Sequence, residues 1–149
     1  MPVRDAEVAD AAEICALIEE HARYEGNETL VLDRAEMTKH LFGPEPKAWV
    51  LIATPPRRPD VVAGFALCSW NFSTWDARPG IWLDDLFIRP DHRRHGLGRE
   101  LLNALRARTS GRVEWEMKDG NERAAAFYAR LGAEPVGGWI KYRWSPPQQ

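Results

Sequence analysis

Positive charge and glycine gather in the segment RRHGLGRE, at residues 93–100, where an apolar strand-like run gives way to a helical pattern. Arg93, Arg94 and Arg99 outweigh Glu100 as charges at this helix start. The first N–H groups of a helix lack intrahelical partners and carry partial positive charge, so they attract anions. Glycine lets an anion approach the backbone closely. The segment therefore predicts a site for a doubly charged anion such as a pyrophosphate.

The spacing of the same segment excludes two familiar nucleotide-binding loops. A Walker A loop needs Gly, four residues, Gly, Lys and then Ser or Thr, and a dinucleotide fingerprint needs a third glycine three residues after the second. Neither pattern is present in the segment. A turn that contains glycines and solvent-exposed arginines, with no bound anion, would have the same sequence. The segment alone therefore leaves this structural interpretation open.

The elements that must position this segment follow from the spacing of apolar residues. Helical spacing covers 11–24 and a shorter stretch between the N-cap Asp33 and the stop Gly43. A helix follows the glycine segment, and NERAAAFYARL, ended by Gly132, predicts another. Short apolar runs rich in β-branched and aromatic residues predict strands. These strands are AWVLIAT, VVAGFALCSW, GIWLDDLFI, RVEWEM and WIKYRW.

With one further strand expected ahead of the helix at 11–24, the element order β, α, α, β, β, β, α, β, α, β predicts an α/β fold with a mixed, α+β-like sheet and helices on both faces. Residues 81–117 contain its one βαβ-like unit, in which a strand, the glycine turn, a helix and a strand follow one another.

The composition is that of one ordinary globular domain, 1–149, long enough to bury a core without disulfides. A net charge of -2 gives no global reason to expect nucleic acid or an anionic membrane as a partner. Cys15 and Cys68 stand singly in apolar segments and the four histidines share no spacing, so no metal site is expected. No apolar run is long enough to span a bilayer and no signal peptide is evident, and we expect the protein in the cytoplasm.

Two motifs together resemble those of a known family. The run LDDLFIRP followed by Arg93-x-x-Gly96-x-Gly98 resembles the acyl-CoA pyrophosphate motif of the GNAT superfamily of N-acetyltransferases, and NERAAAFYARLGAEP resembles its downstream motif. Within the superfamily, ARYEG, WLDDLFIRPDHRRHGLG, VEWEM and GNERAAAFY resemble the diamine (spermidine/spermine) and thialysine acetyltransferase branch. The resemblance implies a GNAT fold with a mostly antiparallel central sheet, and acetyl-CoA as co-substrate.

The resemblance also assigns residues to the donor. The backbone of Leu86, Phe87 and Ile88 would pair with the amides of the pantetheine arm, although plain core packing also explains apolar side chains there. The pyrophosphate would lie on the glycine segment, and residues 121–124 would line the far side of the donor. Those two sets are Arg93, Arg94, His95, Gly96, Leu97, Gly98 and Arg99, and Asn121, Glu122, Arg123 and Ala124.

Two further residues match positions of acid–base chemistry. The phenol of Tyr128 would donate a proton to the sulfur as the thiolate leaves, although a core tyrosine would give the same letters. An ammonium must lose a proton before it attacks, and Asp84 would accept it through water. Neighbouring strand residues face opposite sides, so only one of Asp84 and Asp85 is expected in the cleft. The alternative is that Asp84 and Asp85 have a structural role only, as ion-pair partners of Arg89 or as caps of a turn.

Acidic and aromatic residues elsewhere match stretches that line the amine pocket of the branch, and suit a cation through ion pairs and cation–π contacts. The branch has an acid before a late Trp, whereas Gly137 and Gly138 precede Trp139 here. Glu114 and Glu116 also fit a solvated strand face. The expected substrate-binding residues are Tyr24, Glu25, Asp76, Asp84, Glu114, Trp115 and Glu116.

The motifs together favour an acetyl-CoA dependent N-acetyltransferase that acts directly on a primary amine of a small molecule, with no metal. The alternatives are an enzyme of the same fold that acetylates a protein or peptide, and a non-catalytic acyl-CoA binding module. The resemblance also implies a homodimer, with the expected strand at 139–144 either at an interface or inside the sheet.

Overall fold

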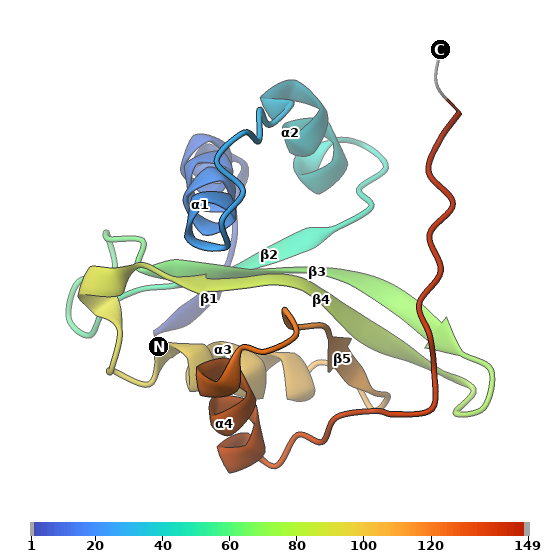
Figure 1. The fold of residues 1–149 in the computed structure, drawn as a ribbon. Coiled ribbons are helices and arrows are strands. Elements are labelled where there is room, and N and C mark those ends of the chain that lie inside the picture. The colour runs from blue at the N-terminus through green and yellow to red at the C-terminus, as the bar shows by residue number, and fades with distance from the viewer. Residues whose placement is uncertain (1, 148–149) are drawn as a thin grey trace. The chain divides into compact units, whose positions relative to one another are not determined.

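The computed structural model describes residues 2–147 and divides into two compact units, Met1–Glu116 and Met117–Gln149. The first unit holds one five-stranded sheet, in the order β1-β2-β3-β4-β5 (Figure 1). Its strands are β1 (Val3–Asp5), β2 (Trp49–Ala53), β3 (Gly64–Ser73), β4 (Arg78–Ile88) and β5 (Val113–Trp115). The first four strands pair antiparallel, and β5 joins β4 in parallel. A mostly antiparallel sheet was expected, and this prediction is confirmed.

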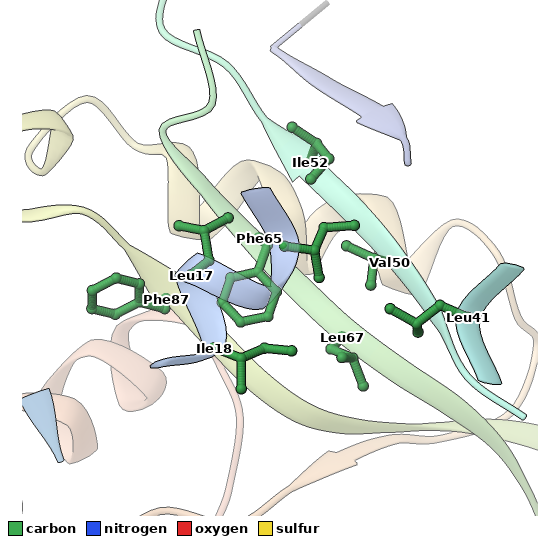
Figure 2. Close-up of a cluster of buried hydrophobic side chains, with 9 residues drawn as sticks. Leu17, Ile18, Leu41, Val50, Ile52, Phe65, Leu67 and Phe87 are labelled. Carbon is green, nitrogen blue, oxygen red and sulfur yellow. The ribbon is translucent and has the colours of Figure 1, made fainter. Parts of the chain in front are cut away.

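Two helices cover one face of this sheet (Figure 1): α1 (Ala11–Tyr24) and α2 (Arg34–Phe42). The side chain of Asp33 accepts a hydrogen bond from the Glu36 N–H and so caps α2, as its spacing predicts. Alternate residues of the strands point toward these helices, and Figure 2 shows Phe65, Leu67 and Phe87 in the resulting buried cluster.

A third helix, α3 (Leu97–Arg106), lies on the opposite face of the sheet (Figure 1). Its apolar stripe, which includes Leu101 and Leu105, is fully buried. The strand residues between those that face α1, such as Leu51 and Ala66, are buried on this second face. The helix joins β4 to the parallel strand β5, so the predicted βαβ unit is present.

A β-bulge interrupts the pairing of β3 with β4. Leu83 lies opposite Cys68 and Asp85 lies opposite Leu67, so Asp84 is an extra residue on β4. Because Leu67 and Cys68 face opposite sides of the sheet, Leu83 and Asp85 do so as well, although they are two residues apart. Asp85 therefore shares the α1 face with Phe87, whereas Leu83 faces α3.

The second unit contains α4 (Glu122–Leu131), which ends at Gly132 with a left-handed φ of 90°. That start and stop match the prediction from sequence. The strand expected at 139–144 was wrong, since the structure has no helix or strand over residues 133–147. Alternating apolar residues favour a strand only when a partner strand takes up their backbone hydrogen bonds. No helix within residues 2–147 is long and apolar enough to cross a membrane.

Candidate active site

One edge of β4 is open where the donor is expected. β5 pairs with β4 only at Ile81, Trp82 and Leu83, so the ladder between these two strands stops at the bulge. Within the described residues, 84–88 have no strand partner on the β5 side. Backbone N–H and C=O groups of such an edge pair with amides of an extended ligand. The predicted pantetheine-binding residues, Leu86 to Ile88, lie on this edge.

The start of α3 has the features of an anion site. Gly96 is its N-cap, with a left-handed φ of 74° and no side-chain cap for the first N–H groups of the helix. A side chain on Gly96 would meet no atom within 4 Å, so the space above the helix end is open. Arg94, also left-handed with φ 70°, is exposed beside it, as are His95 and Arg99. Exposed positive charge and free helix N–H groups suit a pyrophosphate, and the role of these residues stays a prediction.

The side chain of Arg93 has other partners in the structure. Its Nε donates to the Ile88 carbonyl oxygen at 2.9 Å, and a terminal nitrogen donates to the Tyr24 hydroxyl at 3.2 Å. The guanidinium carbon lies 4.5 Å from the centre of the Tyr24 ring. Arg93 thereby joins the end of β4 to the end of α1.

Polar and aromatic groups from α1 and β4 meet on the α1 face of the bulge. His21 Nε2 lies 3.6 Å from Asp85 Oδ1 and 4.0 Å from Glu25 Oε1. The rings of His21 and Tyr24 lie 5.2 and 6.0 Å from that of Phe87. Tyr24 and Glu25 were predicted substrate-binding residues, and this cluster places carboxylates and aromatic faces together, as a cationic amine requires.

The two neighbouring acids of β4 differ in their surroundings. Asp84 is exposed, whereas the Asp85 side chain is only 23% exposed. Burial, followed by the negative charges of Asp84 and Glu25, raises the pKa of Asp85 to about 6. The expectation that only one of the two acids faces the cleft assumed strict alternation, which fails at the bulge, and Asp84 was chosen by its position in the motif. Neither acid holds Arg89, whose guanidinium pairs with Glu13 and Glu20.

The other predicted acids of the first unit lie in different settings. Asp76, in the turn between β3 and β4, forms an ion pair of 2.8 Å with Arg112. Glu114 and Trp115 belong to β5, opposite Trp82 and Leu83, and are half-buried. Glu116 follows that strand and is exposed.

Predicted residues of the second unit lie at the start and middle of α4. The side chain of Asn121 caps this helix, since its Oδ1 accepts a hydrogen bond of 3.1 Å from the Ala124 N–H. Glu122, Arg123 and Ala124 form its first turn. Tyr128 follows later in the helix, with its ring 5.5 Å from that of Phe127.

The comparison with protein families decides the family of this chain. The model of the Acetyltransferase (GNAT) family matches residues 12–133. The chain belongs to this family. Membership makes the protein an acyltransferase enzyme that takes acetyl-CoA as its co-substrate. The open β4 edge and the uncapped start of α3 are the parts of the acetyltransferase that fit this group.

Individual relatives agree with the family. A thialysine N-epsilon-acetyltransferase of Caenorhabditis elegans is 33% identical, over 89% of this chain and 84% of its own. An L-ornithine N5-acetyltransferase of Arabidopsis thaliana is 39% identical over 53% of the acetyltransferase, but only 36% of the plant protein is matched. The crystal structure of a possible acetyltransferase from Clostridium difficile 630 superimposes with a TM-score of 0.84 at 18% identity, covering 98% of this chain and 97% of that one.

Sequence reasoning missed His21 and set aside Asp85. The signal for His21 was its spacing of four residues from Glu25, which puts both on one side of α1. No sequence pattern marks the bulge that turns Asp85 toward them. Among residues 2–147 of the acetyltransferase, no group of three or more His, Cys, Asp or Glu is arranged to hold a metal ion.

Proposed function

We propose that this acetyltransferase transfers the acetyl group of acetyl-CoA directly to a primary amine of a small molecule, a diamine, a polyamine or a lysine-like amine. The observation that carries the proposal is the cluster of Tyr24, Glu25, Asp85 and Phe87 beside the open part of β4. Carboxylates and aromatic faces together attract an ammonium group. The names of two relatives, a thialysine and an ornithine acetyltransferase, support the same class of acceptor.

The donor would be held by backbone groups and by positive charge. Leu86, Phe87 and Ile88 pair with the pantetheine amides, and the first turn of α3 receives the pyrophosphate between Arg94 and Arg99. Asn121 to Ala124 are proposed to line the remainder of the donor. The acetyl thioester supplies the reactive carbonyl and the leaving sulfur.

Side chains of this protein would then donate protons to the leaving group and contact the acceptor amine. Tyr128 donates a proton to the sulfur as the carbon–sulfur bond breaks, and Asp84 meets the acceptor amine on the exposed side of the bulge. Asp84 reaches one methylene less far than a glutamate, which favours contact through water. The remaining acids, Asp76, Glu114 and Glu116, with Trp115, would attract the far end of a longer amine.

A thiol-release assay tests the proposal. Purified protein is given acetyl-CoA and a panel of diamines, polyamines, lysine analogues and short peptides, and free thiol is measured over time. We expect at least one small amine to raise the rate well above hydrolysis, with the acetylated amine found by mass spectrometry. A rate raised by peptides alone would replace the small acceptor with a protein or peptide acceptor.

Three finer expectations accompany this function. We propose one GNAT domain over 1–149, because the family match runs from residue 12 to 133, through parts of both units. A homodimer and a cytoplasmic location stay predictions. Light scattering coupled to size-exclusion chromatography measures the first, and fractionation of cells measures the second.

A further inference from the structure

His21 is the least expected member of the cluster on the α1 face. It comes from the last turns of α1, its side chain is 17% exposed, and its ring packs against Phe87 at 5.2 Å. The Nε2 atom lies 3.6 Å from Asp85 Oδ1 and 4.0 Å from Glu25 Oε1, so it sits between a half-buried carboxylate and an exposed one. None of the roles described above uses this imidazole.

The charged and titratable groups around the pair come from three segments. Glu25 belongs to the end of α1, Asp84 belongs to the bulge of β4, and Arg93 reaches in from the loop before α3. Arg93 is itself fixed by the Ile88 carbonyl and the Tyr24 hydroxyl. The surroundings of Asp85 and His21 therefore hold two further carboxylates and one guanidinium.

The surroundings keep the imidazole neutral. Its Nδ1 is buried and has no hydrogen-bond partner, and a protonated ring would leave a charged N–H without an acceptor there. Burial lowers the pKa of His21, and Arg93 adds to this effect while Glu25 opposes it. Asp85, by contrast, has a raised pKa of about 6. Near neutral pH the ring is therefore uncharged, and Asp85 is a carboxylate that can take up a proton.

We propose that His21 is a positioning residue for acetyl transfer, which holds the Asp85 carboxylate from α1 so that Asp85 takes the proton leaving the acceptor ammonium. This inference rests on the proposed function. The ammonium nitrogen gives one proton to Asp85, and its lone pair forms the bond to the acetyl carbon as the carbon–sulfur bond breaks. A second proton leaves the nitrogen, one proton ends on the sulfur, and the proton on Asp85 passes to solvent.

Asp85 is chosen over Asp84 because it faces His21 and because its pKa lies close to neutral pH. Proton transfer is most efficient when the acceptor titrates near the working pH, and Asp85, whose pKa is raised to about 6 by burial and by two neighbouring carboxylates, meets this condition. His21 Nε2 lies 3.6 Å from Asp85 Oδ1, and this contact limits how far the carboxylate turns. Asp84 then remains in contact with the charged amine while Asp85 removes its proton.

The test compares variants of His21 in the full chain. His21→Phe keeps a ring against Phe87 but removes both nitrogens, and His21→Gln places an amide N–H near the position of Nε2. The matched control is His40→Phe, since His40 on α2 also pairs with a glutamate four residues away, at 3.0 Å from Glu36. Circular dichroism checks that each variant folds, and His21→Asn, whose amide mimics Nδ1, provides a second variant without the Nε2 donor.

The measurement is kcat/KM for the best amine between pH 5 and 9 at saturating acetyl-CoA. We expect wild type to lose activity below about pH 6, the pKa of Asp85. His21→Phe should fall about tenfold at pH 7, with its acidic limb moved up by about half a pH unit, because the carboxylate loses the polar Nε2 atom beside it. His21→Gln should recover most of the activity, and His21→Asn should not. The KM for acetyl-CoA should not change.

An independent titration tests the contact between His21 and Asp85 separately from acetyl transfer. Nuclear magnetic resonance of carboxyl carbons reports the titration of Asp85 in the free protein, whether or not an amine is turned over. An unmoved Asp85 titration in His21→Phe, or an unmoved acidic limb, overturns the role of His21. If no amine is acetylated, the proposed function itself fails, and a moved titration then establishes only the contact between His21 and Asp85.

Discussion

Asp85 places a charge where the fold would be more stable without one. Burial and the neighbouring carboxylates raise its pKa from 3.8 to about 6. Below pH 4 the acid is neutral in both the folded and the unfolded chain, and it costs nothing. Between about pH 4 and 6 the folded chain holds the proton more tightly, so the free energy of unfolding falls as the pH rises. Above pH 6 the full penalty remains.

Replacing Asp85 with Asn should therefore stabilise the protein in a pH-dependent way. We expect the free energy of unfolding to rise by about 1–3 kcal/mol at pH 8, since one pKa unit corresponds to about 1.4 kcal/mol, and to change little at pH 4. Urea unfolding at the two pH values measures this. Asp60→Asn, at an exposed turn position, is the control and should be neutral at both. A gain of equal size at pH 4 and 8 would contradict the assignment.

A second prediction for a single residue concerns the phenol of Tyr128. Tyr128→Phe should bind acetyl-CoA with nearly unchanged affinity and turn over about 100-fold more slowly, because the hydroxyl acts in the transition state. Calorimetry gives the affinity, and single-turnover kinetics gives the rate. Phe127→Leu, which changes the neighbouring ring on α4, serves as the control. Turnover at the wild-type rate in Tyr128→Phe would remove the phenol from the mechanism.

At the scale of elements, the loop before α3 contains two adjacent arginines with different surroundings. Arg93 is tied to Tyr24 and Ile88, whereas Arg94 is exposed in a left-handed conformation beside the helix end. The loop thus connects the proposed donor site at the start of α3 with the proposed acceptor cluster at the end of α1.

Substitutions of the two arginines should therefore change different Michaelis constants. Arg94→Ala should raise the KM for acetyl-CoA about tenfold and leave the KM for the amine unchanged, since it removes one charged contact. Arg93→Ala should raise the KM for the amine, because Tyr24 loses its partner. Steady-state kinetics with each substrate varied in turn gives both values. Equal effects of the two substitutions on both constants would argue against separate roles.

The elements were predictable from sequence to different degrees. The helices α1 and α2 and the strand β4 follow from apolar spacing and from caps such as Asp33, which act locally. The bulge at Asp84 was not predictable, because it depends on how β3 and β4 align and leaves no local pattern. The expected last strand was wrong for a related reason, since alternation in WIKYRW does not supply a partner strand. The donor residues came from motif resemblance, and His21 was missed because its partner lies on another element.

At the scale of the whole molecule, the donor should act as a stabilising ligand. A ligand that binds only the folded chain adds about 2.7 kcal/mol when it is present at 100 times its Kd. We expect acetyl-CoA at that concentration to raise the unfolding temperature by several degrees in thermal denaturation. Arg94→Ala at the same acetyl-CoA concentration should show a smaller shift. No shift in the wild-type protein would contradict donor binding at the start of α3.

The bulge has a consequence for which changes the chain tolerates. Before Asp84 the apolar residues Ile81 and Leu83 face α3, and after it Asp85 and Phe87 face α1. Exchanging the side chain at position 84 leaves both halves of β4 in phase. Deleting that residue would make Leu83 and Asp85 neighbours, and neighbouring residues of a regular strand face opposite sides, so both halves of β4 would still face the same helices and only the bulge would be lost. The bulged residue therefore adds an exposed carboxylate and a local bend to β4, and its loss should remove these two features while the buried faces of the strand stay in place.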